Sequence, residues 1–78
     1  MLDCTATQGQ YLAYIYHYTK LVGRPPAEAD MQRHFGVSPP SVHRMILALE
    51  RLGFISREAA RPRSICLLVA PEELPVLR

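Results

Sequence analysis

Apolar residues recur at intervals of three and four over the first third of the chain, the spacing of one helix face. The stripe consists of Leu12, Ile15, Thr19 and Val22, with Tyr11 and Tyr18 beside it. Thr5 precedes the stripe, and its hydroxyl can cap a first helical turn. Gly23 and the two prolines that soon follow it cannot continue the helix. The pattern predicts a helix over residues 5–22.

Two further stripes follow, and a glycine closes each of them. Met31 and Phe35 lie one turn apart behind acidic residues that suit the positive end of a helix dipole, which predicts a short helix from about residue 27 to Gly36. The third helix has the clearest start, because Ser38 can cap it and the next two prolines need no amide partner. Gly53 ends it. The apolar stripe of this helix consists of Val42, Met45 or Ile46, Leu49 and Leu52.

Two β-prone runs, residues 54–57 and 64–69, lie on either side of a short polar link that contains Arg61 and Arg63. Such a pair predicts a hairpin with a basic tip. Residues 71–78 include two prolines and predict an irregular tail. The sequence therefore predicts a winged helix-turn-helix domain over residues 1–70. This fold is mainly α, with three helices and a two- or three-stranded wing.

Composition limits what the chain can be. Its 78 residues leave room for one domain with a modest core and none for a second, catalytic domain. With 49% hydrophobic and 21% charged residues, it should fold. The net charge is only +2, but residues 32–70 carry six arginines against Glu50 and Glu58. This basic segment indicates either a polyanionic partner or a solvated basic face.

A helix-turn-helix followed by a basic hairpin suits double-stranded DNA, because the second helix of the pair fits the major groove and its first-turn amides can meet phosphates. Ser41, His43 and Arg44 lie on the first turn and a half, where such helices meet base edges. Arg51, farther along, is expected to contact a phosphate. The wing arginines Arg57, Arg61 and Arg63 are expected to follow the backbone. Each of these side chains could instead simply be solvated.

Short motifs along the chain resemble the DNA-binding domain of the SOS repressor LexA, from about residue 4 to residue 68. They are the run at residues 4–8, Leu12, Ile15, the run at residues 23–26, Phe35-Gly36, Ser38-Pro39, Val42, Ile46, the run at residues 48–50, Gly53, Ile55 and Arg63-Ser64-Ile65. Residues 37–42 are also similar to the recognition helix of metal-dependent repressors of the diphtheria-toxin-repressor type. Both resemblances imply a winged helix-turn-helix docked on DNA. By them Ser38 and Pro40 join Ser41, His43 and Arg44 at or beside base-reading positions.

The chain departs from the LexA pattern in three places. The turn before Ser38 is one residue shorter, Ala27 replaces the usual capping threonine, and the recognition residues differ. A LexA operator is therefore not expected. The serine-lysine domain that LexA uses to cleave itself has no counterpart in these 78 residues, so self-cleavage is not expected.

Residues that could carry chemistry are poorly arranged for it. The possible metal ligands are the histidines and cysteines, and no pair of them has the spacing of a zinc site. They are His17, His34, His43, Cys4 and Cys66. The few carboxylates are expected on exposed helix ends or turns, so no acid-base pair is evident. We therefore expect neither an enzyme, a metal, a cofactor nor a small-molecule ligand.

The least charged stretch of the first half, residues 4–18, is too short and too polar to span a bilayer. No signal-peptide pattern precedes it. We therefore expect no membrane association, a cytoplasmic location, and free thiols at Cys4 and Cys66.

These observations favour a sequence-specific transcriptional regulator, most simply a LexA-like repressor module. One small domain supplies few contacts to DNA, so we expect a homodimer built from the first helix and the C-terminal segment. The alternative is a winged-helix module that binds another protein, through the same surface or through Leu47 and the exposed tyrosines. The chain could also be one domain of a larger repressor.

Overall fold

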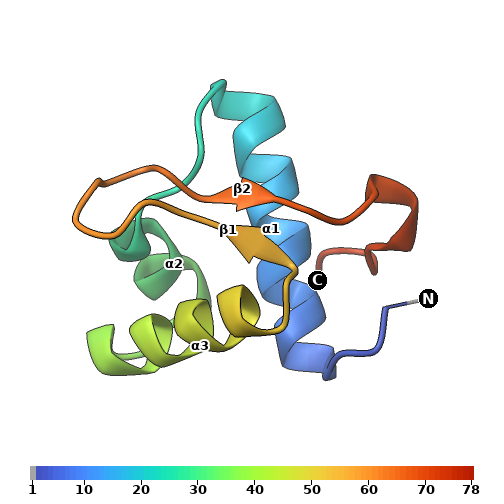
Figure 1. Cartoon of the computed structure of the whole chain (residues 1–78), viewed down its shortest axis with the longest axis horizontal. Coiled ribbons are helices and arrows are strands. Elements are labelled where there is room, and N and C mark those ends of the chain that lie inside the picture. Colours follow the sequence, from blue (N-terminus) through green and yellow to red (C-terminus); the bar gives the residue numbers. More distant parts are fainter. Residues whose placement is uncertain (1) are drawn as a thin grey trace.

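The three predicted helices all form in the computed structural model, which describes residues 2–78. They are α1 (Ala6–Val22), α2 (Glu28–Phe35) and α3 (Pro39–Arg51). A two-stranded antiparallel sheet follows, made by β1 (Ile55–Ser56) and β2 (Cys66–Leu67), and then a short 3-10 helix, Pro71–Glu73. Figure 1 shows the sheet lying across α1, with α3 beneath it. Three helices and a two-stranded wing confirm the predicted fold class.

Local signals set the helix ends as expected. The backbone N–H of Gln8 donates to the Thr5 hydroxyl at 3.1 Å, and the Gln8 side chain accepts from the Thr5 N–H at 3.0 Å, a complete capping box. Gly23 and Gly36 end α1 and α2 with φ of 88° and 65°, a backbone region that residues with a Cβ rarely adopt. Ala27 has no hydroxyl to cap α2.

Side chains from all three helices and the wing form the core. Its fully buried members include Leu12, Ile15, Met31, Val42, Ile46, Leu49 and Ile55. Tyr11 stacks on Phe35 with ring centroids 4.1 Å apart, which adds an aromatic contact between α1 and α2. Two predicted core residues are wrong: Val22 is 50% exposed and Leu52 is 51% exposed. Val22 lies on the last turn of α1, where the helix projects past the sheet (Figure 1), and Leu52 follows the end of α3.

The hairpin is present but its strands are shorter than predicted. Ile55 pairs with Leu67 and Ser56 with Cys66. One further bond, from the Leu68 N–H to the Phe54 carbonyl at 2.9 Å, extends the ladder by a step. Beyond Ser56 the chain leaves the extended conformation and forms a loop, residues 57–65. We call β1, β2 and this loop the wing.

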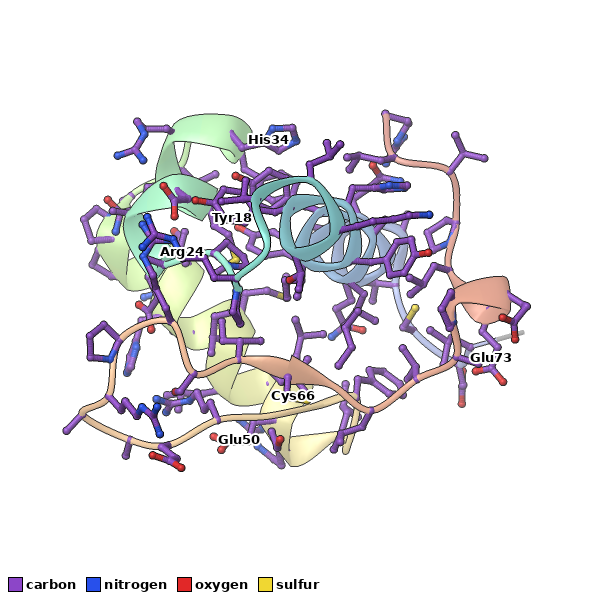
Figure 2. All side chains as sticks on the ribbon, turned by 90° about the horizontal axis from the view of Figure 1, so that it is seen from above. Tyr18, Arg24, His34, Glu50, Cys66 and Glu73 are labelled. Carbon is purple, nitrogen blue, oxygen red and sulfur yellow. The ribbon has the colours of Figure 1, made fainter. Side chains whose placement is uncertain are left out.

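The N-terminal end of α3 and the loop of the wing lie at the same end of the molecule, while both chain ends lie at the other (Figure 1). Seen from above, Glu73 of the tail is likewise far from that loop (Figure 2). The candidate DNA-contacting residues are therefore clear of the tail.

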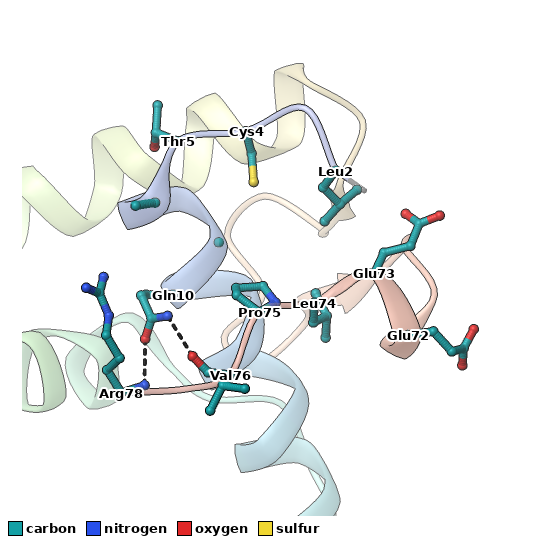
Figure 3. A pocket seen from close by; sticks show the side chains of 12 residues that line it. Leu2, Cys4, Thr5, Gln10, Glu72, Glu73, Leu74, Pro75, Val76 and Arg78 are labelled. Atoms are coloured by element: carbon teal, nitrogen blue, oxygen red, sulfur yellow. Dashed lines mark hydrogen bonds between the residues drawn. The ribbon is translucent and has the colours of Figure 1, made fainter.

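The tail is held against α1. Gln10, only 8% exposed, donates from Nε2 to the Val76 carbonyl at 2.9 Å and accepts the Arg78 N–H on Oε1 at 2.8 Å (Figure 3). Pro75 packs over Gly9, where a Cβ would lie 3.0 Å from Pro75 Cγ. A groove of about 840 Å³ remains between the tail and the start of α1. The tail is thus irregular after its 3-10 helix but fixed in position.

Candidate nucleic-acid interface

The N-terminal turn of α3 is closed by its own residues. Ser38 caps the helix, and its hydroxyl accepts the N–H of Ser41 at 3.3 Å. The N–H of Val42 donates to the Ser38 carbonyl at 3.2 Å, and Pro39 and Pro40 have no N–H to offer. The expectation that first-turn amides of this helix meet phosphates is therefore wrong. Recognition by this turn has to come from side chains.

Those side chains point to solvent. The His43 side chain is 52% exposed, and Pro40, Arg44 and Arg51 are also exposed. Arg44 donates only one long hydrogen bond, 3.4 Å to the Ser41 hydroxyl, so its guanidinium keeps most of its donors free. The opposite face of α3, with Val42 and Ile46, is fully buried. Of the three predicted base readers, His43 and Arg44 are exposed and Ser41 is half-buried.

An acidic residue accompanies one of the predicted base readers. Glu28 Oε2, on the first turn of α2, lies 3.2 Å from Nδ1 of His43. The carboxylate can orient the imidazole ring, and it competes with any anion for a protonated His43. Sequence reasoning missed this pair, because the two residues lie on different helices.

Two of the three wing arginines are paired with glutamates. Arg61 Nη1 lies 3.1 Å from Glu58 Oε2, and both side chains are about two-thirds exposed. Arg57 Nε lies 3.3 Å from Glu50 Oε1 on α3, and its side chain is only 16% exposed. An exposed pair such as Arg61–Glu58 contributes little to stability, so Arg61 can leave Glu58 for a phosphate at small cost. Arg57 lies between the wing and α3, and within residues 2–78 its buried Nε has this ion pair but no hydrogen-bond partner.

Arg63 is engaged inside the protein. Its Nη1 donates to the Tyr18 hydroxyl at 3.1 Å and to the Pro25 carbonyl at 3.2 Å, and lies 3.1 Å from Asp30 Oδ2. The prediction that Arg63 follows the DNA backbone therefore does not fit its geometry, because the contacting nitrogen is already committed to α1, α2 and the turn between them. We call Tyr18, Pro25, Asp30 and Arg63 the Arg63 cluster.

Asp30 corrects a second expectation, that the carboxylates are all exposed. It is only 8% exposed and accepts the Ala27 N–H at 2.8 Å. This is one of the two hydrogen bonds of a capping box, and it forms although Ala27 has no hydroxyl for the other. The hydrogen bond from the Ala27 N–H is the largest cause that holds the pKa of Asp30 below its ordinary value, and the charges of Arg63 and Arg33 act in the same direction. Asp30 is therefore a permanent anion at neutral pH.

A cleft of about 380 Å³ lies between α3, the start of α2 and the wing. Its cationic or titratable lining residues are His43, Arg57, Arg61 and Arg63, with Glu28 as the anion among them. His43 of α3 and the arginines of the wing thus share one concave surface, as a helix and wing that act on one DNA duplex require.

Comparison with known proteins places this geometry in a family. The family model of the LexA DNA binding domain matches residues 1–64. The chain belongs to the LexA DNA-binding domain family. It is 34% identical over 76 residues to the LexA repressor of Thermosipho africanus, a match covering 97% of this chain and 38% of that protein. It is also 34% identical over 70 residues to the LexA repressor of Oleidesulfovibrio alaskensis, covering 90% of this chain and 34% of that protein.

The match to the LexA repressors concerns one part of them. This chain spans little more than a third of the length of these relatives. The match to the Thermosipho africanus protein nevertheless extends past the family model, over 76 of the 78 residues. The region of similarity to LexA therefore takes in most of the tail that Gln10 holds.

Within residues 2–78, no three or more histidine, cysteine, aspartate or glutamate side chains lie where they could hold a metal ion. None of the helices described there has the length and apolar character needed to cross a membrane. Cys4 and Cys66 are both free.

Proposed function

We propose that this chain is a sequence-specific module for double-stranded DNA that represses transcription by occupying an operator. The observation that carries the proposal is the shared cleft, in which His43 of α3 and the wing residues Arg57 and Arg61 line one surface. Membership of the LexA DNA-binding domain family supports the same reading. A repressor works where the chromosome is, so a cytoplasmic location belongs to this proposal.

Each candidate residue has a distinct proposed role. His43 and Arg44 read base edges, because they are exposed on the first turns of α3, and the half-buried Ser41 beside them shares this role. Ser38 and Pro40 lie beside them and shape the end of the helix. Arg51 and Arg61 contact phosphates. Arg57 is the weaker candidate of the set, because its side chain is only 16% exposed and lies beside Glu50. Arg63 is not among the proposed phosphate contacts, because its Nη1 is engaged by Tyr18, Pro25 and Asp30.

A second copy is part of the proposal, because one helix and one wing make few contacts with DNA. The face formed by α1 and the tail is the proposed dimer surface. It lies away from the end that carries the candidate DNA-contacting residues (Figure 1). Sedimentation at high protein concentration, with and without a duplex that contains a two-fold site, should show a dimer. A single monomeric species under both conditions would reject this part of the proposal.

Salt dependence tests DNA binding itself. Each neutralised phosphate contributes about −0.9 to the slope of log affinity against log salt, so three to four contacts should weaken binding roughly 40- to 150-fold between about 50 and about 200 mM salt. Fluorescence anisotropy of a labelled duplex measures this change. Arg61→Gln should make the slope shallower by about 0.9 for each bound copy. Arg78→Gln, at the opposite end of the molecule, should leave the slope unchanged.

The alternative, a protein-interaction module, predicts a different outcome. An apolar docking surface responds weakly to salt, because screening acts on charges and not on apolar contacts. Absence of duplex binding at about 50 mM salt, or a slope near zero, would therefore exclude the DNA-binding proposal and favour the alternative.

A further inference from the structure

One guanidinium contacts three separate parts of the helical body from the wing. Arg63 lies three residues before β2, and its Nη1 contacts α1 through Tyr18, the α1–α2 turn through Pro25, and α2 through Asp30. Its φ of 55° lies in the left-handed region, which is unfavourable for a non-glycine residue and persists where surrounding contacts hold it. The backbone at Arg63 is therefore fixed by what its side chain binds.

Besides the buried side chain of Ile65, few contacts fix this part of the wing. The ladder between β1 and β2 has two residue pairs and one further hydrogen bond. The loop is closed on itself by Ser64, whose hydroxyl accepts the Glu58 N–H at 3.0 Å, and by the Arg61 N–H, which donates to the Glu58 carbonyl at 3.2 Å. These bonds shape the loop but do not attach it to the helices. Within residues 2–78, the polar attachment of the wing to the helices runs through Arg63 and through the Glu50–Arg57 pair.

We propose that Asp30, Tyr18 and Arg63 form a positioning device that sets the wing relative to α3, and that DNA affinity depends on it without contact between these residues and DNA. The inference rests on the proposed function, since it concerns how the DNA-binding surface is arranged. A wing held in place before binding loses less conformational freedom on the duplex than a mobile one, so disruption of the cluster weakens binding.

The decisive variant is Asp30→Asn, because two mechanisms predict opposite signs for it. If Asp30 acts only through its charge, removal of an anion makes the protein more attractive to DNA and affinity rises. If Asp30 positions the wing, affinity falls, by about tenfold. Glu58→Gln is the matched control. It removes one negative charge from the wing without touching the Arg63 cluster, and its affinity should equal or exceed that of the unmodified protein.

Tyr18→Phe is a second variant that tests the same inference if Asp30→Asn is too unstable. Tyr18→Phe deletes one hydroxyl and changes no charge. We expect about threefold weaker binding and an unaltered salt slope, at a temperature where circular dichroism shows both variants folded. Arg63→Lys should also bind DNA more weakly than the unmodified protein, since an ammonium lacks the planar fork that reaches several acceptors. If Arg63→Gln lowers the salt slope by about 0.9 while Asp30→Asn and Tyr18→Phe bind normally, Arg63 contacts a phosphate and the inference is overturned.

Hydrogen exchange of the free protein separates this inference from the proposed function. The amides of Glu58 and Arg61 are hydrogen-bonded within the wing, so they report its local opening. They should exchange faster in Asp30→Asn and Tyr18→Phe than in Glu58→Gln. Unchanged exchange in the first two variants contradicts the inference even if the protein binds DNA. Faster exchange in a protein that binds no duplex would keep the positioning role and remove the proposed function.

Discussion

Replacement of Ile46 by alanine lowers the free energy of unfolding by about 2–5 kcal/mol. Ile46 is fully buried on the inner face of α3, within the core cluster that includes Leu12, Leu49 and Ile55. The substitution removes three carbons from a packed site and leaves a cavity that its neighbours fill only in part. A domain of this size has a total stability of only about 4–12 kcal/mol. The variant therefore loses a large share of its stability, visible as a lower urea midpoint.

Leu21→Ala is the matched control for this measurement. Leu21 is 85% exposed near the end of α1, so the same kind of truncation should change the free energy of unfolding by no more than about 0.5 kcal/mol. Equal losses in the two variants would contradict the packing described for α3. The outcome bears on function as well, because the burial of Ile46 is what turns His43 and Arg44 outward.

The helix boundaries could be predicted from sequence because capping is a local interaction. Thr5 and Ser38 each bond to a backbone N–H three residues later, and Gly23 supplies a left-handed residue directly after α1. The outward face of α3 followed from the periodicity of Val42 and Ile46. No fact about the rest of the chain was needed for these predictions.

The role of Arg63 could not be predicted in the same way, because its partners lie far away in sequence. Tyr18 is 45 residues from it and Pro25 is 38 residues from it. A wing arginine counts equally toward a basic patch whether it faces solvent or an internal anion. The only sequence signal was Asp30 itself, an acidic residue at the third position of a helix whose cap, Ala27, has no hydroxyl.

Local signals also misled in one case. Ser38, Pro39 and Pro40 mark the start of α3 well, and the same residues remove the free amides expected to bind phosphate there. A good helix start and an open anion site are different properties. On the proposed function, we therefore expect the sequence selectivity of α3 to depend on its side chains, with Arg44 foremost.

Arg44→Ala should relax sequence preference at one base pair. An exposed arginine on the second turn of a recognition helix can donate two hydrogen bonds to a guanine, a contact worth roughly 1–3 kcal/mol of discrimination against other bases. The Arg44 guanidinium is available for such a contact, since its one intramolecular bond, to Ser41, is 3.4 Å long. Selection of bound duplexes from a random pool, with the unmodified protein and then with the variant, measures the change position by position.

Arg51→Ala serves as the comparison, because Arg51 is equally exposed but lies about two turns farther along α3. As a phosphate contact, it should weaken binding to all duplexes alike and reduce the salt slope by about 0.9. Arg44→Ala should instead leave binding to duplexes that already differ at the affected position nearly unchanged. A uniform loss for Arg44→Ala across the pool would make Arg44 a phosphate contact, and base reading would then fall to His43 and Ser41, the other predicted base readers of α3.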